Sequence, residues 1–350
     1  MRPPLLKAVR DSLRYGYAVG RVRALEVRVL RDATYERLVD APSFAEQKRI
    51  LSDTAYGPHL EGVQTADGVE RGLEAAMHEV YGLVSDLGLP EPIVRFFRVR
   101  HDFANLRARL KAEVLGADAQ SDLSSLGTVP PEVVAGPVEA LPEHLRRVAQ
   151  EVLEALAELD ERSERDGGAV AGSLAKLEVV DGIVERAAYA ELASLAKASG
   201  SEFLREYVSL QVDLANVKRV LRSRRRAEPL AEVEPRLLEG GRISRARLAA
   251  AYQLPLEELA ERLASERALR GVAVEELLAL DRLDVAADAL AVRMMREGRA
   301  VPLGAEPVVA YVLAREAEVR QLRVLLIGKL AGLGAEELRA RLRKVYVSRG

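Results

Sequence analysis

Apolar residues recur at steps of three and four positions through most long segments of the chain, and the alternation typical of strands is nearly absent. Because a helix turns once every ~3.6 residues, this period places the apolar side chains on one helix face. Asp67 and Glu70 resemble a capping box at the start of one such segment, and Gly88 with Pro90 ends it. Its apolar stripe comprises Val69, Leu73, Met77, Val80, Val84 and Leu87. We therefore predict an all-α fold.

The same period predicts further helices, separated by breaks that contain Gly or Pro. One extends from about Glu91 to Leu115, with Gly116 as its C-cap. The stretch from Asp118 to Pro142 is rich in Ser, Gly and Pro, and it is the best candidate for an interdomain linker. Further helices are predicted from Pro142 to the break at Gly167, and over Ser173–Ala198, Ser201–Arg226, Leu283–Arg296, Pro307–Ile327 and Glu336–Lys344.

A six-residue pattern occurs three times: an acid, an apolar residue, any residue, an amide, an aliphatic residue and a base. The copies are Asp102–Arg107, Asp213–Lys218 and the looser Glu318–Arg323, and their starts lie 111 and 105 residues apart. Each copy follows a helical apolar stripe, so the three copies belong to equivalent helices. The repeat predicts three related helical modules (residues 1–125, 126–241 and 242–350) that pack around a pseudo-threefold axis and leave a central cavity.

The polar side chains of the repeat have two interpretations. An acid and an amide three residues apart share a helix face, next to the apolar stripe. They form either a polar recognition point repeated around the axis or a helix-to-loop hydrogen bond that fixes how each module packs. We favour the second, because buried polar groups must find partners. The pairs are Asp102 with Asn105, Asp213 with Asn216, and Glu318 with Gln321.

Composition and charge narrow the class of protein. The chain has 350 residues, 52 Lys and Arg, 54 Asp and Glu and a formal net charge of −2, so no global positive field favours nucleic acid as a partner. It contains no Cys, which excludes disulfides, thiolate metal sites and thiol nucleophiles. No segment approaches the ~20 apolar residues of a membrane-spanning helix, and the N-terminus lacks a signal-peptide core. These features predict a cytosolic protein without a bilayer-spanning segment.

The sequence offers no catalytic, cofactor or metal site. The four histidines have no metal-ligand spacing. Gly167 to Gly172 has the glycine spacing of a phosphate loop, but Ser173 follows where that motif requires Lys. We therefore predict no catalytic residue, no cofactor and no metal.

A basic cluster falls at the C-terminal end of one predicted helix. There, cations complement the exposed carbonyl groups and the helix dipole. We favour this capping role, and contact with an acidic protein surface is the alternative. The cluster consists of Arg222, Arg224, Arg225 and Arg226.

Several blocks of sequence, in this order along the chain, resemble the family of C subunits of V-type/A-type ATP synthases, the relatives of the eukaryotic d subunit. The blocks span almost the whole chain. They are Tyr15–Leu25, Leu51–Gly57, Asp102–Arg107, Pro302–Tyr311, Glu318–Arg323, Gly328–Lys329, Arg339–Arg343 and Tyr346–Val347.

The resemblance implies a non-catalytic rotor subunit of a proton- or sodium-translocating ATPase or ATP synthase. It implies a funnel of three helical domains that sits on the membrane proteolipid (c/L) ring and receives the foot of the central stalk, the D and F subunits, so that torque passes between them. It also implies a peripheral position at the cytoplasmic face of the membrane. The residues alone leave open a free-standing helical-repeat scaffold that binds a partner helix in its groove.

Overall fold

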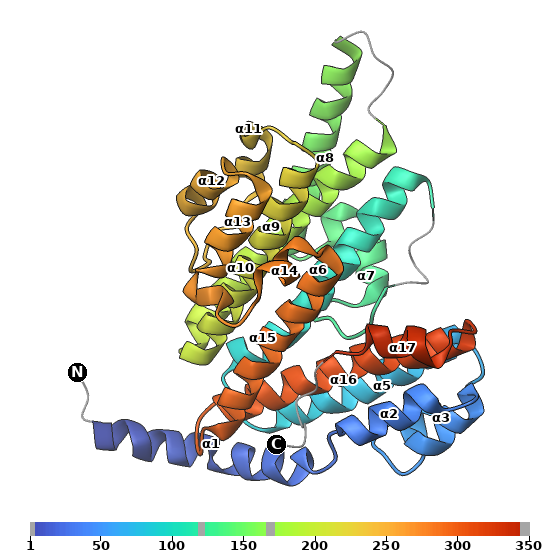
Figure 1. Cartoon of the computed structure of the whole chain (residues 1–350). Coiled ribbons are helices and arrows are strands. Elements are labelled where there is room, and N and C mark those ends of the chain that lie inside the picture. Colours follow the sequence, from blue (N-terminus) through green and yellow to red (C-terminus); the bar gives the residue numbers. More distant parts are fainter. Residues whose placement is uncertain (1–3, 118–122, 166–171, 344–350) are drawn as a thin grey trace.

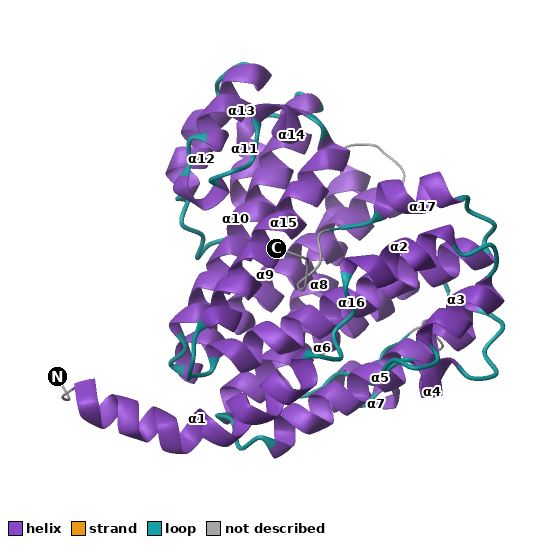
Figure 2. Ribbon diagram, turned by 60° about the horizontal axis from the view of Figure 1, so that its bottom comes forward, coloured by secondary structure: helices purple, strands orange, loops and turns teal. Residues whose placement is uncertain are grey.

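The computed structural model of the chain describes residues 4–117, 123–165 and 172–343. Every regular element in these ranges is a helix, which confirms the predicted all-α class (Figure 2). Helical periodicity identified the long helices correctly because each buries one apolar face. None of the described helices combines the length and the apolar character that crossing a bilayer requires.

The lower part of the molecule in Figure 1 joins the two ends of the chain. The last long helix, α16 (Glu306–Leu330), packs on α1 and α5, and α17 (Ala335–Arg341) packs on α2. The N-terminal helices are α1 (Pro4–Glu26), α2 (Asp32–Asp40), α3 (Phe44–Leu51), α4 (Gly57–Leu60) and α5 (Ala66–Asp86).

The upper part of Figure 1 contains the middle of the chain, and α6 and α15 run from the lower part into it. Helix α9 packs along α6, α8 and α10, and α15 packs along α10 and α16. The helices here are α6 (Glu91–Leu115), α7 (Pro131–Ala135), α8 (Glu143–Arg165), α9 (Ser173–Ser199), α10 (Glu202–Arg225), α11 (Leu230–Val233), α12 (Arg245–Tyr252), α13 (Leu256–Ala264), α14 (Val274–Leu278) and α15 (Leu280–Ala300).

Two details at the helix ends differ from the sequence prediction. Helix α5 begins one residue before Asp67, and its N-cap is Thr65, whose hydroxyl accepts a hydrogen bond from the Gly68 N–H at 3.1 Å. The predicted capping box at Asp67 and Glu70 is therefore wrong, since the side chain that bonds the first turn lies two residues earlier. At the other end of the chain, α17 stops at Arg341, and Lys344 lies outside the described residues.

The stretch predicted to be an interdomain linker is folded onto the protein where the structure describes it. Residues 118–122 lie outside the described ranges. Beyond them, Leu126, Val129, Val134 and Leu141 are buried, and α7 lies within the same stretch. Its Gly and Pro residues therefore shape a packed loop, as buried apolar side chains require.

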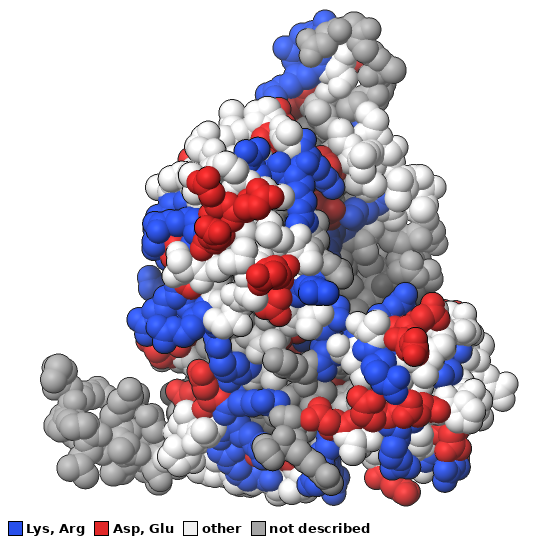
Figure 3. Space-filling model, viewed as in Figure 1, with Lys and Arg blue, Asp and Glu red and all other residues white. Residues whose placement is uncertain are grey.

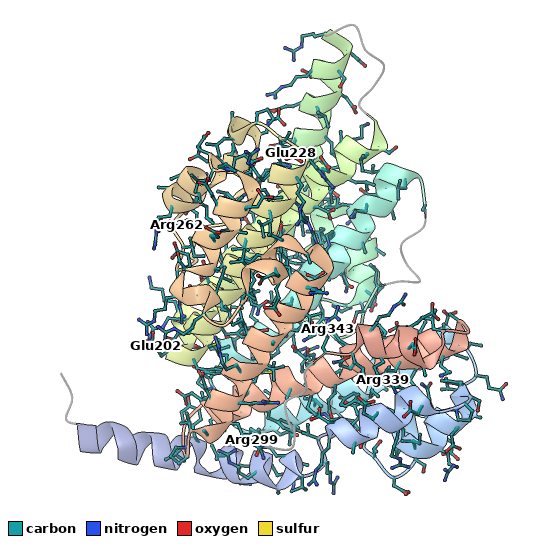
Figure 4. The ribbon with its side chains drawn as sticks, in the orientation of Figure 1. Glu202, Glu228, Arg262, Arg299, Arg339 and Arg343 are labelled. Atoms are coloured by element: carbon teal, nitrogen blue, oxygen red, sulfur yellow. The ribbon has the colours of Figure 1, made fainter. Side chains whose placement is uncertain are left out.

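Ion pairs and hydrogen bonds join the first helices to the last ones. Arg299 on α15 reaches Glu26 on α1 with an N–O distance of 3.3 Å, and Arg339 on α17 reaches Asp40 on α2 at 2.6 Å (Figure 4). The buried Gln47 side chain on α3 donates to the carbonyl of Leu38 at 2.8 Å and to that of Leu325 on α16 at 3.4 Å. The two ion pairs close the fold, because they bring together residues that lie almost the whole chain apart.

The buried apolar side chains form two clusters. The larger runs from Tyr15 to Leu338 and fills the space between α1, α5, α6, α8, α9 and α16. The smaller runs from Leu210 to Leu290 and joins α10 to the short helices α11–α14 and to α15. Helix α10 contributes to both clusters, so it couples them mechanically.

Replacing Gly72 with Ala is expected to lower the melting temperature, because the added Cβ would lie 2.4 Å from the carbonyl oxygen of His59. Gly82, in the same helix, has nothing within 4 Å of the equivalent position. The control variant Gly82→Ala is therefore expected to raise stability by up to about 1 kcal/mol through helix propensity. Thermal unfolding followed by circular dichroism measures both. An equal gain in the two variants would contradict the close approach of α4 to α5.

Candidate functional site

The first copy of the repeat holds a loop against α6. The Asp102 carboxylate accepts hydrogen bonds from the N–H groups of Thr128 at 2.7 Å and Val129 at 3.0 Å. One turn further along, the Asn105 amide donates to the carbonyl of Ser124 at 2.7 Å and accepts from its N–H at 2.8 Å. Both side chains are buried. The side chains of the repeat thus provide hydrogen-bond partners for backbone N–H and C=O groups of a loop that has no secondary structure of its own.

The second copy makes the same contacts on α10. The Asp213 carboxylate accepts from the N–H groups of Arg242 at 3.0 Å and Ile243 at 2.9 Å. The Asn216 amide pairs with both backbone groups of Leu238, at 2.9 Å and 2.8 Å. The two helices therefore hold two loops by one shared geometry.

A glycine stands at the same place in each of these loops. A Cβ on Gly127 would lie 2.2 Å from an oxygen of Asp102, and a Cβ on Gly241 would lie 2.3 Å from the matching oxygen of Asp213. Each glycine directly precedes the first N–H that the carboxylate binds. The loop backbone comes this close to the carboxylate, so a side chain at either glycine would push the carboxylate away from the N–H groups that it binds.

The third copy, on α16, uses its acid differently. The longer Glu318 side chain reaches the N-terminal part of the chain, where it accepts from the Leu30 N–H and from the Tyr56 hydroxyl, the latter at 3.0 Å. It also pairs with Arg315 at 3.1 Å. Gln321 donates to the carbonyl of Arg343 at 2.9 Å. The amide thus still holds a following segment, while the acid ties α16 to the region around α1 and α4.

Burial and hydrogen bonding act in opposite directions on these carboxylates. Burial raises the pKa of Asp102 and Asp213. The Thr128 hydroxyl and the facing N–H groups oppose the rise at Asp102, and the facing N–H groups oppose it at Asp213. Burial also raises the pKa of Glu318, against the nearby charge of Arg315.

The buried carboxylate of Glu316 connects α16 with α6 and α5. Arg100 on α6 bonds the Glu316 carboxylate, and the Tyr81 hydroxyl donates to the same carboxylate at 2.7 Å. Burial disfavours the charged form of Glu316, but Arg100 and Tyr81 outweigh it and hold the pKa of Glu316 below its usual range. The Tyr81 oxygen also lies 3.0 Å from Nε2 of His101. This network fixes the position of α16 relative to α5 and α6.

A cavity of about 670 Å³ lies between α6, α9, α10, α15 and α16. All three helices that carry the repeat contribute to its wall, through residues such as Arg107, Ala215 and Arg320. A smaller hollow of about 240 Å³ adjoins it and shares Tyr189 and Tyr207 with it. Eight Lys or Arg residues but four Asp or Glu residues line the larger cavity. Lys and Arg side chains also gather along the middle of the face seen in Figure 3.

Three arginines of the basic cluster at the end of α10 contact partners on other segments, and the fourth lines the cavity. Arg224 donates to the carbonyl of Leu254 at 3.0 Å, Arg225 donates to the carbonyl of Leu278, and Arg226 lies 3.6 Å from Glu228. The two carbonyls belong to the segments after α12 and at the end of α14, and not to the end of α10 itself. Arg222 is exposed and lines the cavity.

The described residues contain no group of three or more His, Asp or Glu side chains placed to hold a metal ion. Gly167 to Ala171, the start of the phosphate-loop-like spacing, lie outside the described ranges. Sequence analysis did not find the network of Arg100 with Glu316, because 216 residues separate the two in sequence. Arg107 and Arg320 were also not singled out, although both lie within repeat copies.

The comparisons agree with the resemblance of the ordered sequence blocks. A sequence profile described as ATP synthase (C/AC39) subunit matches residues 18–341. The class is therefore that of non-catalytic accessory subunits of rotary ATP synthases. The chain belongs to the ATP synthase (C/AC39) subunit family, which confirms the resemblance seen in the sequence.

Individual relatives match over most of their length. The C subunit of the A-type ATP synthase of Thermococcus onnurineus is 28% identical over 334 residues, which cover 92% of this chain and 87% of that protein. The C subunit of the V-type ATP synthase of Thermus thermophilus is 29% identical over 319 residues, covering 89% of this chain and 93% of that protein. Its A-type counterpart from Methanocaldococcus jannaschii is 23% identical over 372 residues, covering 97% of this chain and 88% of that protein.

Replacing Asn216 with Leu is expected to lower the free energy of unfolding by about 1–3 kcal/mol, because both backbone groups of Leu238 lose their partner in a buried place. Asn105→Leu is expected to do the same at Ser124. The control is Gln211→Leu in α10, at a half-buried position without a side-chain hydrogen bond in the described structure, where a change below about 0.5 kcal/mol is expected. Urea unfolding measures all three, and unchanged midpoints for both Asn variants would refute the assignment.

Stability is expected to fall on acidification partly through His101. Burial, helped by the charge of Arg100, lowers the pKa of His101 to about 4, against ~6.5 for an exposed imidazole. The unfolded state therefore binds the proton more tightly, so this contribution is complete above about pH 6.5 and is lost as the pH falls from 6.5 towards 4. An NMR titration of the imidazole is expected to give a midpoint near pH 4. A midpoint near pH 6.5 would contradict the buried environment.

Proposed function

We propose that this chain is the rotor component that couples the central stalk, the D and F subunits, to the membrane proteolipid ring, at the cytoplasmic face of the membrane. Torque then passes through it during ATP synthesis or hydrolysis. The supporting observation is a cavity of about 670 Å³ whose wall includes the three helices that carry the repeat. A cavity of this kind can receive the end of the central stalk, so that the stalk and this chain rotate together.

The proposed architecture is a funnel of three modules, residues 1–125, 126–241 and 242–350, around a pseudo-threefold axis. The matching loop contacts of Asp102 and Asp213 support equivalence of the first two modules. The Gln321 contact to a carbonyl 22 residues later supports the third, because Asn216 bonds Leu238 at the same separation.

Torque transmission requires a stiff body, and three features supply stiffness. Close-packed apolar cores resist deformation. The ion pair of the half-buried Arg100 with the buried Glu316 resists separation of α6 from α16. The contacts of Glu318 tie the C-terminal helices to the N-terminal ones. Load applied at the cavity wall is thereby shared over the whole chain.

Purification of the tagged chain from membranes of its own host tests the proposal. Solubilisation in a mild detergent, followed by mass spectrometry, is expected to recover the stalk subunits and the proteolipid ring with the chain. The same tag on an unrelated soluble protein provides the control. Recovery of the chain without any ATP synthase subunit would refute the proposal, and recovery dominated by other proteins would favour a free-standing scaffold instead.

A further inference from the structure

The acidic residues of the cavity are already neutralised by partners within the chain. Asp181 pairs with Lys111 at 2.8 Å, and Asp288 pairs with Arg343 at 3.1 Å. Both of these cations lie outside the set that lines the cavity. The remaining two acids are paired as well, Glu185 with Arg219 and Glu228 with Arg236.

The basic residues of the cavity are only partly neutralised. Arg100 and Lys218 pair with Glu316 and Asp284, in addition to the pairs just named. Within the described parts of the chain, no ion pair or side-chain hydrogen bond engages Arg107, Arg222 or Arg320, which all line the cavity and are exposed. One of them comes from each repeat helix, α6, α10 and α16.

Among the described residues, these three guanidinium groups around one hollow have no ion-pair partner, so the hollow favours a negatively charged ligand. Like charges that share a concave surface repel, and a partner of opposite charge relieves that repulsion. Guanidinium groups bind carboxylates through two parallel hydrogen bonds, so arginine holds a carboxylate in a defined orientation.

The volume of the cavity limits how large a segment of the partner can enter it. A helix with its side chains is ~10–12 Å wide and rises ~5.4 Å per turn, so a volume of about 670 Å³ accommodates roughly one turn. The C-terminal end of a helix also carries the negative end of the helix dipole. A helix end with carboxylates in its last turn therefore fits the hollow in both shape and charge.

We propose that the stalk segment which enters the cavity is such an acidic helix end, and that Arg107, Arg222 and Arg320 bind its carboxylates. This inference rests on the proposed function, because it takes the central stalk as the partner. It goes further by assigning the recognition to three arginines on three helices. Since exposed charge pairs are screened by salt, the grip on the stalk weakens as ionic strength rises.

The test measures binding of the full-length chain to the purified pair of stalk subunits by isothermal titration calorimetry at about 50 and 300 mM NaCl. The wild-type Kd is expected to rise with salt. Arg107→Glu, Arg222→Glu and Arg320→Glu are each expected to raise the low-salt Kd about tenfold or more. Arg107→Lys, which keeps the charge but loses the two-pronged geometry, is expected to fall between wild type and Arg107→Glu.

The matched control is Arg262→Glu on α13, an exposed arginine that does not line the cavity and that Figure 4 shows at the outer edge of the molecule. It is expected to leave the Kd unchanged. Melting curves verify that all variants are folded, which their exposed positions favour. A stalk pair whose terminal carboxylates are replaced by Lys is expected to bind Arg222→Glu better than it binds wild type.

The outcomes separate the two proposals. If wild type binds the stalk tightly while the three cavity variants and Arg262→Glu bind equally well, the arginine assignment is overturned and the proposed function stands. If the Kd of wild type is independent of salt, an acidic partner is likewise refuted. If wild type does not bind the stalk pair at all, the proposed function fails, and this inference fails with it.

Discussion

The fold depends on the need of buried carboxylates and amides to find hydrogen-bond donors. Each repeat helix carries an acid and an amide on a face that is otherwise apolar, and burial without partners would cost several kcal/mol per charged group. On α6 and α10 a glycine-containing loop supplies those partners. On α16 the N-terminal part of the chain supplies them for Glu318. Placement of the loops follows from this requirement, and Glu318 adds one of the contacts between the chain ends.

The sequence predicted the helices and the repeat because both leave local signals. The period of apolar positions located α5, α6, α9 and α10 to within a residue or two. The spacing of Asp213 and Asn216 indicated a shared helix face. What the sequence did not reveal was which atoms receive these side chains, since loop docking depends on tertiary geometry and not on period. Thr65 as a cap was missed for a smaller reason: two acids nearby also fit a capping pattern.

The charge of the cavity was hidden for a different reason. A formal net charge of −2 gives no sign of a basic surface. The excess of positive charge on the cavity wall appears only when each acid is assigned its ion-pair partner in the structure. Lys111 and Arg343 neutralise two of the cavity acids from outside the cavity. Three arginines of the wall have no ion-pair partner within the described structure. Neither the pairing nor the resulting sign is readable from composition.

The junction of α5 with α16 has a consequence for biosynthesis. Tyr81 meets Glu316 across 235 residues of chain, so the part of α5 that packs on α16 is uncovered when it leaves the ribosome. At ~5–20 residues per second, α16 follows roughly 10 to 50 s later. Contacts between residues so far apart in sequence slow folding, and apolar surface stays exposed until α16 has been synthesised. The nascent polypeptide is accordingly a natural client for chaperones that shield an unfinished N-terminal half.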